Sequence, residues 1–393
     1  MKAMKNAVYP VIMTGAAVLA WFCAVSGSGN RDEAFAEYFQ KARINEGKQA
    51  YITAAEWYAK ASEIKPDDAE SLLLAAENFL RCGEKNMFLK YCRMAAESSG
   101  ADDRPWVLMG QYYLDSGDAA KASGLMARVP ESCRTEAVEE VKKKADSSFR
   151  KSYKKFADAK PFRDGYFAVS DGSLWGLADE DGDYCILPEY EDVGAFSKDE
   201  GVVPVCSEGV WMFVNADGQT CCVPSEKYTW LGAFGYGAAP FCCDGKYGYT
   251  DLEYNESSEK YDYAGAFSDG VAAVKKSGHW TLINSDFKPL TEFEYDEIEV
   301  DDYGFCVKNG TVTARKDGKT VYLDTDGKET EYEKHYSCGL SPISSGDYQG
   351  YENAEGDIVI DAFFEEVTDF TDKGRALVRE DGWWKVITLD IYR

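Results

Sequence analysis

Apolar and polar positions alternate with two different periods along this chain. Between residues 35 and about 136, apolar and small residues recur at the spacing of amphipathic helices, and the pattern repeats about every 34 residues. From residue 157 onward, short apolar runs are separated by Asp-Gly and Ser-Gly pairs, which favour the tight turns of antiparallel hairpins. The chain therefore predicts a helical part over 31–156 and an all-β part over 157–393, after an N-terminal segment of residues 1–30.

The clearest helical copy is WVLMGQYYLDSGDAAKASGLM, residues 106–126. Its aromatic and small residues lie along one helix face, Gly117-Asp118 forms the turn, and a small residue opens the partner's face. This copy resembles the tetratricopeptide repeat, whose signature is W-x2-L-G-x2-Y followed by a small residue in the second helix. Two earlier copies match in part. The positions that carry the resemblance are Ala54, Tyr58, Ala61, Pro66, Ala76, Gly83, Trp106, Gly110, Tyr113 and Ala122.

The resemblance implies a stack of three helix hairpins whose surface binds a peptide or a partner domain. The alternative is that so short a stack serves only as a spacer. A charged stretch over 134–156 predicts a final helix that caps the stack.

A second repeat occupies the all-β part. An aromatic residue usually leads each copy, an Asn or Asp follows four positions later in six of seven copies, and a carboxylate follows six positions later in all seven. The leading residues are spaced 29 to 40 residues apart. They are Trp175, Trp211, Tyr247, Trp280, Thr320, Gln349 and Trp384. Because the residue two positions later faces the same side of a strand, we expect these aromatics to be core rather than a ligand platform.

The fourth copy shows the expected elements in order. Residues 271–276 predict a strand, 277–278 a hairpin turn, 279–284 a second strand, and 285–288 a second turn. An Asn or Asp at the start of the second turn can accept hydrogen bonds from the backbone two residues on. The repeated acidic residues are thus predicted to shape hairpin corners.

A calcium site is the competing interpretation of these acidic corners. An EF-type loop needs D-x-[DN]-x-[DN]-G with a distant Glu between two helices, and no copy has that pattern. The densest corner, with Asp179, Asp181 and Asp183, is the metal candidate, but turn formation is the preferred interpretation. We expect no cofactor.

These copies resemble the WG (KWG) repeat, a bacterial β-repeat named for its Trp-Gly pair. The resemblance implies a binding or scaffold module and supplies no catalytic residues. It predicts a β-propeller of about six or seven small blades, because closure protects sheet edges; a linear β-solenoid is the alternative. The signature positions are Trp175, Gly176, Trp211, Tyr247, Gly248, Trp280, Trp384, Asp181, Asp217, Asp286 and Asp326.

The N-terminus has the layout of an export signal. Lys2 and Lys5 precede an apolar stretch over residues 8–25, and small residues follow it. The stretch predicts a cleaved signal peptide or a retained membrane anchor, and Cys23 adds lipidation as a third option. We therefore expect a periplasmic or cell-surface protein whose membrane contact is limited to this segment.

The charge is unevenly distributed and narrows the classes of partner. Net charge is −26; residues 157–393 hold 48 acidic and 20 basic side chains, whereas residues 1–156 hold 21 and 23. So negative a field disfavours nucleic acid and favours a basic ligand or a glycan on the β part. The chain has only two histidines, which gives little support for a Ser-His-Asp or Cys-His catalytic arrangement. We therefore expect a non-enzymatic interaction protein. The alternative is a carbohydrate-active enzyme or glycan-binding module that uses carboxylates and aromatic residues.

Overall fold

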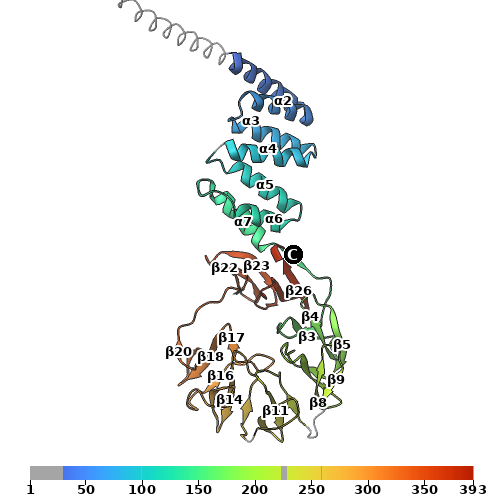
Figure 1. The fold of residues 1–393 in the computed structure, drawn as a ribbon, viewed down its shortest axis with the longest axis vertical. Helices are drawn as coiled ribbons and strands as arrows, with labels where there is room; N and C mark the ends of the chain where they lie inside the picture. Colours follow the sequence, from blue (N-terminus) through green and yellow to red (C-terminus); the bar gives the residue numbers. More distant parts are fainter. Residues whose placement is uncertain (1–29, 99, 223–227, 258, 393) are drawn as a thin grey trace, which may run out of the picture. The chain divides into compact units, whose positions relative to one another are not determined.

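The computed structural model describes residues 30–392 except 99, 223–227 and 258, and the chain divides into two compact units, Met1–Ser148 and Phe149–Arg393 (Figure 1). The first unit is a helical stack and the second is a seven-bladed β-propeller, so the predicted fold class is confirmed and the linear solenoid is wrong. The predicted export signal or anchor, including Cys23, lies outside the described residues. Within the described residues, no helix combines the length and apolar character needed to cross a bilayer.

The helical unit is a succession of antiparallel hairpins. A helix over 30–47 packs against α2 through the ring pairs Tyr38–Trp57 and Phe39–Tyr58. Helix α3 pairs with α4 and α5 with α6, while α7 packs against α5 and α6. The bounds are α2 Tyr51–Ile64, α3 Ala69–Arg81, α4 Lys85–Ser98, α5 Arg104–Asp115, α6 Ala119–Met126, a 3-10 turn Glu131–Cys133 and α7 Glu136–Ser147.

Small residues set the spacing between these helices. A Cβ added at Gly110 would lie 2.7 Å from Val141 Cγ1 and 2.8 Å from Met126 Cε, so α5 approaches α6 and α7 closely only because that position is glycine. The other predicted small positions of the helices, Ala54, Ala61, Ala76 and Ala122, are fully buried, as is Tyr58.

The predicted turns and caps fall between the helices. Gly83 and Gly117 have positive φ after α3 and α5. Asp118 accepts a hydrogen bond from the Lys121 backbone N–H and caps α6, and Pro66 lies in the turn after α2. Trp106 and Tyr113 are partly buried.

The predicted capping helix over 134–156 is too long. Helix α7 ends at Ser147, and the next residues form strand β1, which belongs to the propeller. The boundary between the units therefore lies at Ser148/Phe149 and not at 156/157.

The propeller consists, within the described residues, of seven antiparallel sheets in chain order, here called blades 1 to 7. Blade 1 contains β2 Asp158–Ala159, β3 Tyr166–Ser170, β4 Trp175–Asp179 and β5 Tyr184–Tyr190; blade 2 contains β6 Asp192–Val193, β7 Val202–Ser207, β8 Val210–Asn215 and β9 Thr220–Cys222. Blade 3 contains β10 Trp230–Leu231, β11 Ala239–Cys243 and β12 Lys246–Thr250; blade 4 contains β13 Tyr263–Ala264, β14 Val271–Lys276 and β15 His279–Asn284. Blade 5 contains β16 Glu297–Ile298, β17 Val307–Lys308, β18 Thr311–Lys316, β19 Lys319–Leu323 and β20 Glu329–Thr330; blade 6 contains β21 Leu340–Ser345, β22 Tyr348–Asn353 and β23 Ile358–Phe364. Blade 7 contains β24 Glu366–Val367, β25 Arg375–Glu380, β26 Trp383–Leu389 and β1 Phe149–Lys151.

The strands of blade 4 match the sequence prediction residue for residue: β14 and β15 are the two predicted strands, joined at Ser277-Gly278. Buried side chains of neighbouring sheets interlock into continuous clusters; one runs from Leu177 and Ile186 of blade 1 to Val203 and Val214 of blade 2. The core thus lies between blades, which is why a single blade would not be stable alone.

The ring closes because the first strand of the unit completes the last blade. Strand β1 pairs with β26 in antiparallel register, Phe149 opposite Leu389 and Lys151 opposite Ile387. Lys151 and Lys385 both bind the Glu380 carboxylate and lower its pKa. In Figure 1 the red C-terminal strand β26 lies beside the green strands of blade 1.

The acidic residues of the repeat form hairpin corners, as predicted. In the first copy the Asp179 Oδ1 atom accepts hydrogen bonds from the backbone N–H groups of Asp181 and Asp183, at 3.0 and 2.9 Å. The same oxygen accepts the same two bonds at Asn215, Asp251, Asn284 and Asp324, and at Asn353 it accepts the N–H of Asp357.

These corners support a prediction with its control two residues away. Asp324→Ala removes two hydrogen bonds to the backbone and is expected to cost about 1 kcal/mol of unfolding free energy. Asp326→Ala removes only an exposed ion pair with Lys328 and is expected to cost about 0.3 kcal/mol or less. Urea unfolding of both variants measures the difference. Equal losses would show that the corner carboxylate has no special structural task.

Candidate functional site

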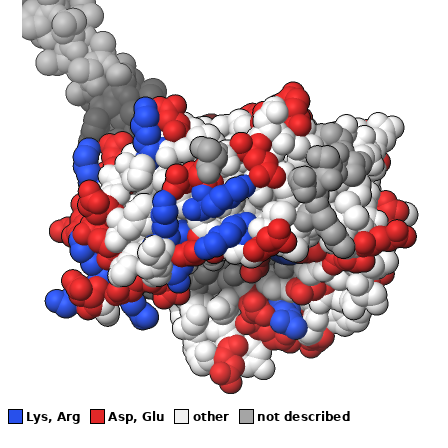
Figure 2. Space-filling model, turned by 90° about the horizontal axis from the view of Figure 1, so that it is seen from below, with Lys and Arg blue, Asp and Glu red and all other residues white. Residues whose placement is uncertain are grey.

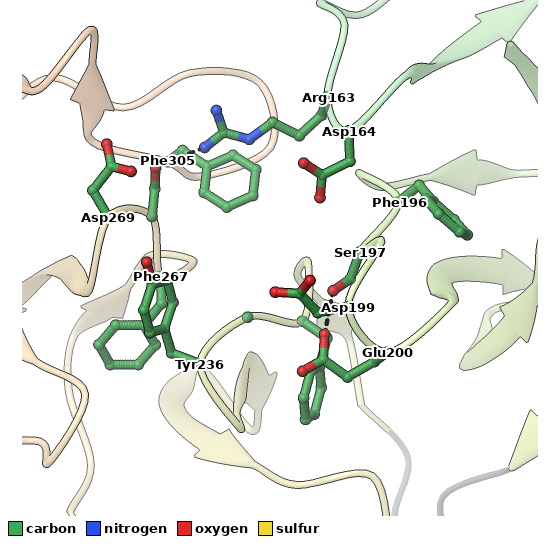
Figure 3. Close-up of a pocket in the computed structure, with 13 residues that line it drawn as sticks. Arg163, Asp164, Phe196, Ser197, Asp199, Glu200, Tyr236, Phe267, Asp269 and Phe305 are labelled. Carbon is green, nitrogen blue, oxygen red and sulfur yellow. Dashed lines mark hydrogen bonds between the residues drawn. The ribbon is translucent and has the colours of Figure 1, made fainter.

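A cavity of about 370 Å³ opens at one end of the propeller, among the turns that join the first two strands of blades 1 to 4 (Figure 3). Blade 5 adds Phe305. The lining residues are Arg163, Asp164, Phe196, Ser197, Asp199, Glu200, Phe234, Gly235, Tyr236, Phe267, Ser268, Asp269 and Phe305. Four carboxylates thus face one guanidinium, and aromatic side chains lie between them.

Three of the four lining turns have the same geometry because the same short motif recurs. F-R-D-G, F-G-Y-G and F-S-D-G place Asp164, Tyr236 and Asp269 at the first turn position, each with φ between 51° and 54°, followed by a glycine of positive φ. Such two-residue turns match the twist of the strands they join and hold their side chains at the sheet end. The turn of blade 2 is longer and carries Asp199 and Glu200.

Two of the four carboxylates of the cavity accept hydrogen bonds from the protein, and within the described part of the chain the other two do not. Asp164 Oδ2 accepts the Lys198 backbone N–H at 3.2 Å and ties blade 1 to blade 2, while the Ser197 hydroxyl donates to Glu200. Asp199 and Asp269 are exposed and, among the described residues, have no hydrogen bond or ion pair. Figure 3 shows the Asp164 and Asp199 carboxylates directed toward the open centre.

Arg163 forms one wall of the cavity. Its guanidinium carbon lies 3.8 Å from the centroid of the Phe305 ring, and its Nη2 donates to Ser268 Oγ at 2.8 Å. Phe305 is held in place because the Asp301 Oδ1 atom accepts the N–H groups of Tyr303 and Phe305.

Tyr303 anchors the same segment of blade 5 to blade 1. Its hydroxyl accepts the Ala168 N–H, and burial raises the pKa of that hydroxyl. Blade 5 is therefore linked to blade 1 through Tyr303, and to blade 4 through the hydrogen bond from the Ala266 N–H to the Gly304 carbonyl.

The predicted signature residues lie apart from this cavity. Trp211 and Trp384 are buried, and Trp175, Tyr247 and Trp280 are half-buried, on the central strands of their blades. Among the acidic signature positions, Asp181 binds Arg375 at 2.7 Å across blades 1 and 7, while Asp217, Asp286 and Asp326 lie on exposed corners.

The metal candidate of blade 1 does not form a common coordination site. Asp179 accepts backbone N–H groups, Asp181 binds Arg375 and Asp183 binds Lys154 at 2.6 Å. Over the described part of the chain, no three His, Cys, Asp or Glu side chains are grouped so that they could hold a metal ion.

Sequence reasoning missed the residues that do come together. The phenylalanines that open three of these segments, Phe196, Phe234 and Phe267, line the cavity with largely buried rings that pack against neighbouring rings. The polar side chains of the lining lie one to four positions later. The signal that could have found them is the recurrence of F-x-[DY]-G before three of the strand pairs.

Acidic side chains also cover much of the outer surface, interspersed with lysine and arginine, as the face in Figure 2 shows. The cavity is therefore one acidic feature on a broadly acidic unit, and tests of its role need controls for overall charge.

Comparison with solved structures finds matches of low similarity. The AfRom2 CNH domain is 8% identical, with a TM-score of 0.36 over 62% of this chain and 96% of that one. Hsv2 of Kluyveromyces lactis is 9% identical, with a TM-score of 0.35 over 55% and 85%. The Cps50 (Swd1) propeller of Myceliophteria thermophila is 7% identical, with a TM-score of 0.34 over 59% and 99%. These likenesses carry no conclusion about function.

No curated protein matches the chain. The family described as "WG containing repeat" matches residues 175–211, 258–280, 280–319 and 350–384. Each of the four matches begins or ends at one of the leading residues identified from the repeat, which are Trp175, Trp211, Trp280 and Trp384. All four lie in the propeller unit, and they support a WG-repeat protein whose repeats build the blades.

Proposed function

We propose that this chain is a non-enzymatic, exported interaction scaffold. Residues 8–25 either remain as its membrane anchor or are removed as a signal peptide. The propeller binds a partner protein at the end that carries the cavity. The helical stack, whose hairpins have the small and aromatic positions of tetratricopeptide repeats, binds a second protein or peptide.

One observation carries the proposal: two exposed carboxylates at the cavity, Asp199 and Asp269, are free of the structural tasks that occupy the other repeated acidic residues. The corner residues, such as Asp179 and Asp324, accept backbone hydrogen bonds. Asp199 and Asp269 have no such bonds among the described residues, yet they line a cavity formed by five blades. Loops positioned by a rigid scaffold are where proteins place binding residues.

The two units can be tested separately. The two fragments, residues 31–148 and residues 149–393, are immobilised separately and exposed to extract of the source organism. The captured proteins are identified and purified. Every purified protein is then titrated against both fragments. We expect at least one purified protein to bind each unit with a dissociation constant in the micromolar range or below. Failure of both units to bind any macromolecule, together with glycan cleavage by 149–393, would reverse the proposal.

The carbohydrate-active alternative retains one supporting observation, because four carboxylates and several aromatic side chains line a single cavity. Glycoside hydrolysis needs two carboxyl groups on opposite sides of the scissile bond. Release of reducing sugar from a polysaccharide panel by the intact protein, lost in Asp199→Asn, would favour this alternative over the scaffold.

A further inference from the structure

Tyr236 is the side chain whose conformation points most directly to a ligand. It takes the turn position that Asp164 and Asp269 occupy in blades 1 and 4, with φ 54°. A bulky residue is unfavourable in this left-handed region, where Asn, Asp and Gly are preferred. Its side chain is nevertheless 56% exposed, so burial in the core does not compensate for the conformation. Strain of this kind is typical of binding sites.

The Tyr236 ring lies beside the next turn. A Cβ added at Gly270 would be 3.9 Å from Tyr236 Cε1, which places the ring next to the turn that carries Asp269. Asp199 approaches from blade 2, and Figure 3 shows these groups around one open centre. An exposed aromatic face between two carboxylates is an arrangement that attracts a cation.

Arg163 shows that the chemistry of this cavity suits a guanidinium. The group stacks on Phe305 at 3.8 Å and donates to Ser268 on the same rim. Four carboxylates line the cavity against this single cation, so a second cation would meet a site that remains negative. The volume of about 370 Å³ leaves room for one long basic side chain and its backbone.

We propose that the cavity binds a lysine or arginine side chain on an extended segment of a partner protein. The cationic group lies against the Tyr236 ring and pairs with Asp199 and Asp269. This inference rests on the proposed scaffold function and names the chemistry of its partner. The excess of acidic side chains on the propeller unit raises the encounter rate with a basic segment.

The test measures binding of a defined probe to the full chain. The probe is a fluorescein-labelled glycine–serine peptide with spaced lysines, and its neutral twin carries norleucine at each lysine. Fluorescence polarisation at about 150 mM salt is expected to show binding of the lysine peptide only, and affinity is expected to fall as salt rises.

The variant Asp199→Asn/Asp269→Asn removes both carboxylates that have no structural bond and is expected to weaken binding about tenfold. Its control is Asp317→Asn/Asp381→Asn, which changes net charge equally at the same turn position of the β18–β19 and β25–β26 hairpins. Since successive hairpin turns of an antiparallel sheet alternate between its ends, these turns lie at the end away from the cavity. The control is expected to change affinity less than about twofold.

Tyr236→Asn separates binding from folding. Asparagine suits the left-handed turn, so the variant is expected to be at least as stable as the natural chain while binding the lysine peptide about three times more weakly. A variant that is less stable, or that binds the peptide unchanged, would contradict the assignment of the ring to the ligand.

Three further outcomes would overturn the proposal. The first two are an equal loss of peptide affinity in both double variants, and equal binding of the lysine and norleucine peptides. The third is that Asp199→Asn/Asp269→Asn weakens binding of spermidine but leaves binding of the lysine peptide unchanged. The scaffold function has its own readout. If Asp199→Asn/Asp269→Asn retains the proteins captured by the propeller unit, the scaffold stands and the basic-segment proposal fails.

Discussion

Replacing Gly176 by alanine is expected to destabilise the propeller by about 3 kcal/mol or more, because the added methyl group would collide with backbone. A Cβ there would lie 2.4 Å from the Ile186 carbonyl oxygen and 2.8 Å from Leu187 C and Pro188 N. Strands β4 and β5 shift register at this point, and the resulting bulge carries the second strand across the glycine. Backbone atoms cannot move aside as a flexible side chain can.

The same contact recurs in blade 6. A Cβ at Gly350 would lie 2.3 Å from the Ile360 carbonyl oxygen, and β22 and β23 show the equivalent shift in register. Gly350→Ala is therefore expected to match Gly176→Ala. The glycine of the Trp-Gly pair is thus explained by the close approach of the neighbouring strand and not by a positive φ.

Gly248→Ala is the matched control for both variants. Its nearest neighbours are side-chain atoms and not backbone, Phe241 Cζ at 3.0 Å and Lys260 Nζ at 3.1 Å, so the clash is milder. The expected loss is about 1 kcal/mol or less. Urea unfolding followed by circular dichroism gives the three free energies. Losses at Gly176 and Gly350 no larger than at Gly248 would refute the bulge as the reason for the glycine.

Much of the propeller fold could be predicted from the sequence repeat, because the strands and turns of each blade depend on residues that are close together in the chain. The strands of blade 4 were predicted to the residue, since the Ser277-Gly278 turn and the alternation on both sides depend only on near neighbours. The corner aspartates were also interpreted correctly, since an Asx turn is formed within five residues.

Longer-range structure was less accessible. Residues 149–156 were placed in a helix because they continue the charged stretch that begins at residue 134. Their pairing with β26, more than two hundred residues away, decides the matter, and no local pattern encodes it. The closed propeller was predicted over the open solenoid only on the general ground that closure protects sheet edges, because no local pattern encodes the closure.

The cavity was beyond sequence reasoning for a related cause. Asp199, Tyr236 and Asp269 belong to separate repeats, and their functional interest depends on lying around one opening and lacking structural bonds.

A second set of repeated carboxylates was also missed. It accepts backbone N–H groups at the hairpins of the opposite sheet ends, and it comprises Glu191, Asp262, Asp296 and Glu365.

A chain that begins at residue 157 is expected to lose the cooperative unfolding transition of the propeller, whereas one that begins at 149 keeps it. The shorter chain lacks strand β1 and the bond from Ser152 N–H to the Val386 carbonyl. It also lacks Phe156, which is 1% exposed and exchanges two backbone hydrogen bonds with Trp384. Removing one such aromatic side chain costs about 3–5 kcal/mol, and a typical domain has only about 5–15 kcal/mol in total.

Point variants of the full chain test the same closure without truncation. Phe156→Ala is expected to cost about 3–5 kcal/mol, because its ring packs against Phe167 and lies in the cluster that joins blades 1 and 7. Tyr153→Ala, in the same segment but 88% exposed, is expected to cost less than about 0.5 kcal/mol. Calorimetry of both variants and both truncated chains measures the transitions. A cooperative transition of the 157–393 chain at the temperature of the 149–393 chain would mean that the ring does not depend on β1, and the propeller would then have to be stable as an open arc.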